Sequence, residues 1–170
     1  FEQFVEQGLL DAYLDLSLFE LINYMCGSNA GVDRLEAIAK RAIPQVVAPG
    51  ALNFVSWYGP PETLPAQFRE RTLHMHNPVT TQIKTSPEEM AAVAELMARK
   101  LNKAKGPTVV LVPTRGLCSM DKPGGVFYDP EGDKAFIEVL RRDLEPRIRL
   151  VELDVHIDDP LFAQEAVAIL

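Results

Sequence analysis

Cysteine is scarce in this chain. Only Cys26 and Cys118 occur among its 170 residues, and neither has a companion cysteine or histidine at metal-ligand spacing. Two cysteines are too few for a disulfide framework. The composition therefore predicts a reduced, cytoplasmic protein that needs no structural metal.

Long apolar runs are also missing. No stretch approaches the ~20 apolar residues that cross a bilayer, and the first residues lack the charged and apolar regions of a signal peptide. We therefore expect no membrane segment. The chain begins at Phe1 rather than Met and stops within a predicted helix, so we expect it to be part of a longer protein.

Positive charge is in short supply. The chain has 17 Lys and Arg against 24 Asp and Glu, which gives a formal charge of −7. Since an acidic chain has no general attraction to phosphate backbones, nucleic acid is not an expected partner. The length suffices to bury roughly 68–70% of the unfolded surface around one core, so we treat residues 1–170 as a single domain.

Short apolar runs alternate with helical patterns along the chain. Thr108–Val112 contains four Val or Leu residues without polar alternation, which is typical of a strand covered on both faces. Further strands are predicted at residues 12–16, 45–48, 72–75 and 150–155. Cap-and-proline pairs predict helix starts at Ser86-Pro87, Asp129-Pro130 and Asp159-Pro160. The pattern predicts a three-layer, Rossmann-like α/β domain whose mostly parallel sheet has about five strands flanked by helices.

The loop at residues 113–125 is the richest in chemical groups. Ligands of open parallel sheets bind beyond the carboxyl ends of the strands, and this loop follows the clearest strand. Its functional groups are Arg115, Gly116, Asp121, Gly124 and Gly125. The loop is either a cradle in which a guanidinium and backbone N–H groups hold an anion, or a surface turn in which Arg115 pairs with Asp121.

Other predicted strand ends supply candidate ligand contacts. Asn53, His76 and Asn77 are predicted to hydrogen-bond a ligand at this edge, although turn chemistry explains each of them equally well. His74 and His76 share a strand face, but no third ligand is spaced to join them, so no metal site is expected.

The last predicted strand ends in Asp154 and His156. A carboxylate beside an imidazole is a candidate acid/base pair, although both residue types are also common at strand ends. Residues 49–66 are rich in proline and are predicted to form a long irregular loop. Its aromatics Phe54, Trp57 and Tyr58 are expected to form a lid, an oligomer contact or a small satellite cluster.

Four sequence segments, taken together, resemble one family. They are Ile43–Asn53, His76-Asn77-Pro78, Arg115–Pro130 and His156–Pro160, in this order and with matching spacing. They are similar to the C-terminal domain of an uncharacterised family of ATP-binding proteins, the tomato mosaic virus resistance protein-like family. The resemblance implies a two-domain α/β protein whose N-terminal domain lies outside this chain. It also implies ATP binding by the full-length protein and assembly into homo-oligomers.

These observations lead to one main functional hypothesis and two alternatives. The main hypothesis is a ligand-binding domain that forms one wall of an interdomain crevice for an anionic small molecule or nucleotide. Its contacts would come from the 115–125 loop together with Asn53, His76 and Asn77. The alternatives are a metabolic enzyme using Asp154 and His156, and a scaffold that only oligomerises or binds protein.

Overall fold

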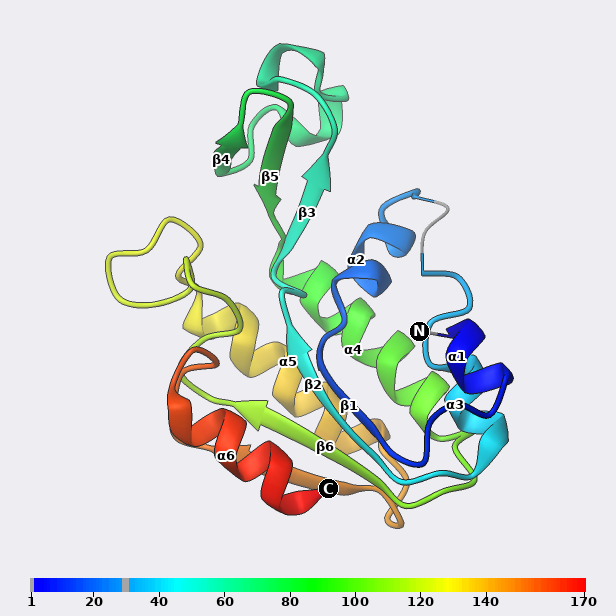
Figure 1. The fold of residues 1–170 in the computed structure, drawn as a ribbon. Helices are drawn as coiled ribbons and strands as arrows, with labels where there is room; N and C mark the ends of the chain where they lie inside the picture. Colours follow the sequence, from blue (N-terminus) through cyan, green and yellow to red (C-terminus); the bar gives the residue numbers. More distant parts are fainter. Residues whose placement is uncertain (1, 29–30) are drawn as a thin grey trace.

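A four-stranded parallel sheet forms the centre of the computed structural model, which describes residues 2–28 and 31–170. The strands lie in the order β1 (Tyr13–Ser17), β2 (Gln45–Gly50), β6 (Thr108–Pro113) and β7 (Arg149–Leu153) (Figure 1). Each neighbouring pair is parallel. The predicted three-layer α/β fold is confirmed, with four strands in the parallel sheet.

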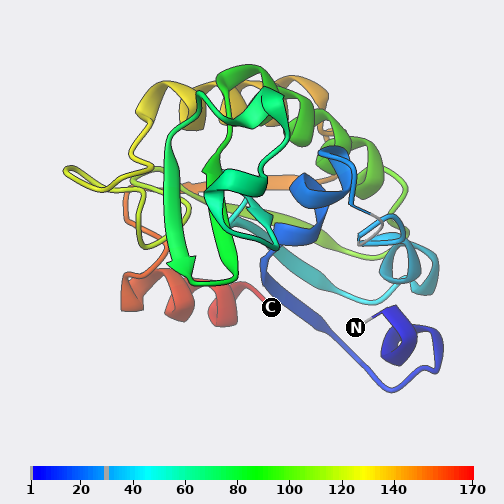
Figure 2. The same cartoon turned by 90° about the horizontal axis from the view of Figure 1, so that it is seen from above.

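Helices cover both faces of this sheet, but unequally. The strands follow one another in chain order, so right-handed crossovers place the connecting helices on one face. That face carries the larger core, and α6 (Pro160–Ile169) packs on the opposite face (Figure 2). The crossover helices are α2 (Phe19–Met25), α3 (Glu36–Arg41), α4 (Pro87–Leu101) and α5 (Pro130–Asp143), and the short α1 (Glu2–Glu6) packs beside α3.

Helix α4 begins where the sequence predicts. The Ser86 hydroxyl accepts a hydrogen bond from the Glu89 N–H at 3.2 Å, and the Ser86 N–H donates to Glu89 Oε2 at 2.8 Å. This capping box satisfies two backbone groups that the first helical turn would otherwise leave unpaired. Met90, Val93 and Met97 follow on the buried side of the helix and pack into the larger core.

A small antiparallel sheet rises from the carboxyl edge of the main sheet (Figure 1). It contains β3 (Phe54–Trp57), β5 (Thr80–Lys84) and β4 (Leu73–Asn77), in the order β3-β5-β4. Two 3-10 turns, Pro61–Thr63 and Ala66–Phe68, lie between β3 and β4. We call residues 54–84 the flap.

The flap departs from the sequence prediction at two points. Residues 49–66 are not irregular throughout, because β3 lies within them. The strand expected at residues 72–75 exists as β4, but it lies in the flap, because the turn after Asn77 returns the chain directly into β5. A short turn permits only antiparallel pairing, whereas a parallel neighbour needs a long crossover. His76 and Asn77 therefore lie on the flap and not at the edge of the parallel sheet.

Within residues 2–28 and 31–170, none of the helices combines the length and the apolar character that crossing a membrane requires.

Candidate functional site

A cavity of about 550 Å³ lies between α2 and the flap. One wall is α2, which contributes Phe19, Glu20 and Asn23, together with Cys26 directly after it. The other wall is the flap, which contributes Val55, Ser56, Trp57, Tyr58, Pro65, Gln67, Phe68 and Ile83. The position agrees with the general rule that ligands of open α/β sheets bind beyond the carboxyl ends of the strands, since α2 directly follows β1.

Asn23 joins the two walls. Its side-chain oxygen accepts a hydrogen bond from the Ser56 N–H of β3 at 3.1 Å, and its Nδ2 donates to the Phe19 carbonyl at 2.9 Å. Both ends of the amide are therefore used within the protein. Because a buried amide strongly favours satisfied hydrogen bonds, Asn23 fixes the spacing between α2 and β3 and so keeps the cavity open.

Trp57 is held in place at the flap side of the cavity. Its indole Nε1–H donates to Thr63 Oγ1 at 2.8 Å, and the Thr63 hydroxyl donates to the Pro60 carbonyl at 2.7 Å. Trp57 and Tyr58 thus line a cavity, as a lid would, whereas Phe54 packs against Phe19 and Phe127 with ring centroids 5.2 and 5.8 Å apart. Two of the three aromatics of this segment therefore line the cavity, and the third packs in an aromatic cluster.

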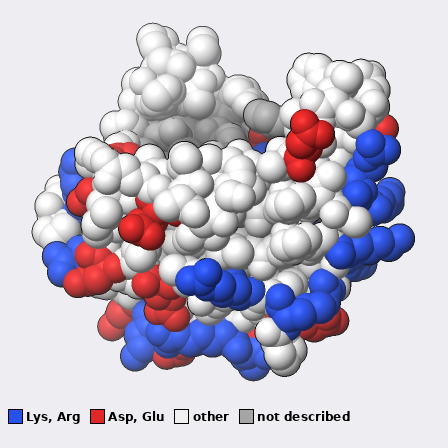
Figure 3. Space-filling model, turned by 60° about the horizontal axis from the view of Figure 1, so that its bottom comes forward, with Lys and Arg blue, Asp and Glu red and all other residues white. Residues whose placement is uncertain are grey.

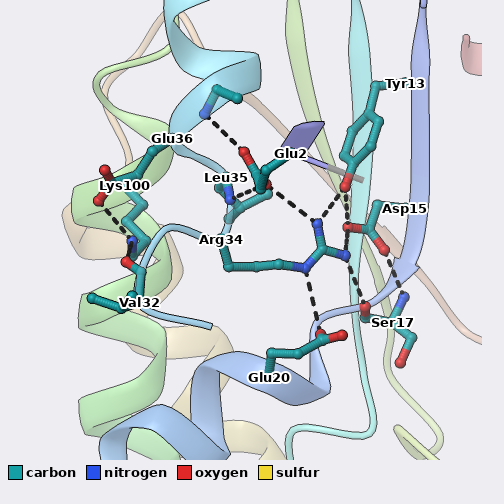
Figure 4. A network of polar contacts seen from close by, with 11 residues as sticks. Glu2, Tyr13, Asp15, Ser17, Glu20, Val32, Arg34, Leu35, Glu36 and Lys100 are labelled. Atoms are coloured by element: carbon teal, nitrogen blue, oxygen red, sulfur yellow. Dashed lines mark hydrogen bonds and ion pairs between the residues drawn. The ribbon is translucent and has the colours of Figure 1, made fainter. Parts of the chain in front are cut away.

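Glu20 is the only charged residue among those that line the described cavity. Its carboxylate accepts from Arg34 Nε at 3.4 Å, and Arg34 is the centre of a buried polar network (Figure 4). The guanidinium also contacts Asp15 and the Tyr13 hydroxyl of β1, and the Tyr13 hydroxyl donates to Asp15 at 2.8 Å.

Burial is the main influence on this network. It raises the pKa of Asp15, although the Arg34 guanidinium opposes the shift, and it raises the pKa of Tyr13 as well. The buried guanidinium forms ion pairs with Glu2, Asp15 and Glu20 and holds β1 to the turn before α3. Asp15 therefore serves the fold, and the network sets the position of Glu20 beside the cavity.

Arg115 forms an exposed ion pair with Asp154. Arg115 Nε and Nη2 lie 2.6 and 2.7 Å from the two carboxylate oxygens, and the guanidinium lowers the pKa of that carboxyl. The alternative pairing of Arg115 with Asp121 does not occur. An anion approaching this loop would have to compete with a bidentate carboxylate for the guanidinium.

Asp121 lies inside the protein and braces the loop. It is 0% exposed, and its carboxylate accepts from Asn53 Nδ2 at 3.0 Å and from the Leu117 N–H at 2.9 Å. Gly116 has φ +125°, and a Cβ there would lie 1.8 Å from the Asp121 carbonyl oxygen. Asn53, Gly116 and Asp121, which were predicted to contact a ligand, thus pack together inside the protein and hold the loop in place.

The remaining glycines of the loop differ. Gly125 packs tightly, because a Cβ there would lie 2.1 Å from the Met120 carbonyl oxygen. Gly124 has φ +82° and open space around its Cα, so its glycine is required by the backbone conformation.

Asp133 is a buried acid that the sequence analysis did not single out. It lies in the first turn of α5 and is 7% exposed. Burial, followed by the charge of Asp121 and a hydrogen bond to it, raises the pKa of Asp133 to about 8. The nearby Asp121 carboxyl group disfavours the charged form of Asp133, so Asp133 keeps its proton to a higher pH than an ordinary Asp. In the sequence, Asp133 looks like an ordinary solvated acid at a helix start.

His156 has partners at both ring nitrogens. Nε2 lies 3.0 Å from the Cys118 carbonyl and 3.2 Å from the Asp121 carbonyl, and Nδ1 accepts from the Asp158 N–H at 3.1 Å. With these partners, Nε2 is the donor and Nδ1 the acceptor of the ring. Asp154 and His156 therefore have different partners, and the structure does not bring them together as an acid/base pair.

His76 and Asn77 are exposed at the end of β4. Asn77 Oδ1 accepts from the Val79 N–H at 2.9 Å, which is the turn chemistry considered for it. Phe19, Asn23 and Phe68, which line the cavity, were not predicted as site residues. The only signal of Phe19 and Phe68 is their apolar, aromatic character, which a buried core would also explain, and Asn23 gives no local signal. Among the described residues, no group of three or more His, Cys, Asp or Glu is placed to hold a metal ion.

The fold and the cavity define an α/β domain with a ligand-sized cavity under an antiparallel flap. The protein-family comparison is more specific: the model described as "Uncharacterised protein family (UPF0261) C-terminal domain" matches residues 1–170. The chain therefore belongs to the UPF0261 family, as its C-terminal domain. The resemblance noted in the sequence is confirmed.

Curated relatives agree with this assignment. A UPF0261 protein of Rhizobium meliloti is 39% identical over 171 residues, which cover 98% of this chain and 43% of the relative. A UPF0261 protein of Clostridium tetani is 38% identical over 95% of this chain and 41% of its own length. The ToMV resistance protein Tm-1(GCR237) of Solanum lycopersicum is 35% identical over 98% of this chain and 22% of its own length. The chain thus spans about two-fifths of the length of the bacterial relatives.

Proposed function

We propose that this domain binds an uncharged or cationic small molecule with a flat apolar face in the cavity between α2 and the flap. The cavity itself is the observation that carries the proposal. Its volume of about 550 Å³ lies within the range of roughly 300–1,000 Å³ typical of small-molecule sites. Its lining combines aromatic side chains with a few polar groups, the usual composition of such sites.

The charge of the lining supports a neutral or cationic ligand. Glu20 is the only charged group among the described lining residues, and an anion would be repelled by its carboxylate. Trp57 and Tyr58 add aromatic faces, which attract flat rings and cations. The triphosphate of ATP does not fit this lining, because phosphate sites use cations or clustered backbone N–H groups.

The other properties expected from the sequence are proposed for the full-length protein. ATP binding, homo-oligomer formation, a cytoplasmic location and an interdomain crevice stay predictions for the longer polypeptide. An anionic ligand at the Arg115 loop stays a competing prediction, weakened by the Asp154 pairing. The acid/base use of Asp154 and His156 has no geometric support, since each side chain is bound elsewhere.

The test uses Trp57, the single tryptophan of the sequence, as the reporter. Protein containing this domain is titrated with a panel of neutral aromatic, cationic, and anionic or nucleotide compounds while its fluorescence is recorded. A ligand in the cavity contacts the indole and changes the emission. The same compound at 100 times its dissociation constant should stabilise the fold by ~2.7 kcal/mol in thermal unfolding.

Two variants locate the binding. Ser56→Phe places a ring in the cavity and should abolish the fluorescence response, whereas Arg115→Ala should leave it unchanged. Glu20→Gln should weaken the binding of cationic compounds and leave the binding of neutral compounds unchanged. If the response survives Ser56→Phe and disappears in Arg115→Ala, the ligand binds the 113–125 loop and the proposal is wrong.

A further inference from the structure

Helix α6 is apolar on the side that faces away from the sheet. At 100° per residue, Phe162, Ala166 and Ile169 lie on the inner side and pack against the sheet. The outer arc carries Ala163, Gln164, Val167 and Ala168, all exposed. Val167 is 65% exposed, and Leu161 on the flank is 45% exposed. Apart from Gln164 this outer arc is apolar, and a helix with apolar residues on opposite sides is normally covered on both.

The sheet face beneath α6 is also incompletely covered. Adjacent strands are ~4.8 Å apart, so the outer two of four strands are about 14 Å apart, whereas a packed helix occupies 8–10 Å. Val46, Ala48 and Leu111 of the two central strands are buried under α6. Leu14 of β1 and Leu153 of β7 on the same face are only partly buried. The layer therefore has room for more structure beside α6.

Charged side chains are sparse across much of the face that Figure 3 presents. Uncharged residues fill its central area, while Asp and Glu lie among them on the left and Lys and Arg gather along the right and lower borders. A large uncharged area with a charged border is typical of a surface that another folded unit covers.

We infer that the outer face of α6 and the partly buried residues beside it are the docking surface for the N-terminal part of the same polypeptide. The matched bacterial relatives are more than twice as long as this chain, and the family description names this domain as the C-terminal one. A segment tethered in the same chain has a high effective concentration, so it covers an apolar face permanently. A lasting apolar contact also explains why the outer face carries no charge, since permanent interfaces are the more hydrophobic ones.

The test measures how fast a thiol on this face reacts in the complete polypeptide. Val167→Cys places the thiol on α6, and Val79→Cys is the matched control, because Val79 is an equally exposed valine (68%) on the flap. Labelling by a maleimide is followed peptide by peptide in mass spectrometry, so Cys26 and Cys118 are counted separately. Protein unfolded in urea gives the unprotected rate for each site.

We expect the thiol at position 167 to react about tenfold or more slowly in the native polypeptide than in urea, because a covered site reacts only when it opens. The thiol at position 79 should react at similar rates in both. Equal rates at the two positions in the native protein would overturn the inference. Protection of position 167 that disappears on dilution would also overturn it, since a second copy of the chain would then be the occupant.

Discussion

Asp133 gives the most direct test of the electrostatics in this fold. Its pKa is raised to about 8 in the folded state by burial and by Asp121, whereas an unfolded Asp has a pKa of about 3.9. Between these values the folded chain holds a proton that the unfolded chain has released. The contribution of this group to stability is therefore complete below about pH 4 and is lost as the pH rises toward 8.

The size of the effect follows from the linkage slope. One proton corresponds to about 1.4 kcal/mol per pH unit, so this group removes up to ~2.7 kcal/mol of unfolding free energy between pH 5 and 7. Asp133→Asn cannot ionise, and its amide can still donate to Asp121. We expect the variant to lack this loss and to become more stable than the parent as the pH rises.

Urea unfolding at pH 5, 6, 7 and 8 measures the difference between parent and variant at each pH. The difference cancels the contributions of the carboxylates that both proteins share. One of these is Asp129, which forms an ion pair with Lys84. Glu131→Gln, an exposed acid in the same helical turn, controls for the loss of one charge at the helix start. Parallel profiles for the parent and Asp133→Asn would refute the raised pKa of Asp133.

Three further substitutions test other parts of the structure by denaturant or thermal unfolding. Gly116→Ala should lower the free energy of unfolding by at least about 2 kcal/mol, because the residue has φ +125° and its Cβ would clash with the Asp121 carbonyl. An unchanged stability would contradict the tight packing of Gly116 against Asp121. Arg34→Met should cost about 3–5 kcal/mol by leaving buried Asp15 without its cation, and a smaller loss at low pH than at pH 7 is expected. Arg115→Ala breaks only an exposed ion pair and should leave the unfolding midpoint unchanged, so a large loss would show that the pair supports the loop.

The main sheet and its helices could be predicted because their signals are local. Four of the five residues of Thr108–Val112 are β-branched and the fifth is Leu, and the cap-and-proline pairs before α4, α5 and α6 specify where each helix starts. The flap could not be predicted in the same way. Its strands are short, and β5 has the sequence Thr80–Lys84, in which only Ile83 is strongly apolar. Pairing with distant β3 makes it a strand, and that information is not local.

The site was predicted in its parts but not in its assembly. Asn53 and Asp121 stand out as polar groups at strand ends, yet 68 residues separate them, and only the fold shows that they bind each other. Arg34 gives no local sign of its buried contact with Asp15, 19 residues away. Side chains that pair over such distances are assigned by packing, so a sequence pattern can indicate each one but not its partner.

The carboxyl edge of the sheet is divided between two polar clusters and one apolar cavity. Arg34 and Asp15 fix the loop after β1, while Asp121 and Asn53 fix the loops after β6 and β2. Arg34, Asp15 and Asp121 make their hydrogen bonds within the protein, so they have little left to offer a ligand, and of these four residues only Asn53 keeps a buried side-chain oxygen without a partner. The flap stands between the clusters, and its aromatic residues face α2 across a cavity with Glu20 as the only charged lining group that the structure describes. The internal pairing of the polar residues at this edge is therefore the reason to expect recognition by shape and aromatic contact instead of by charge.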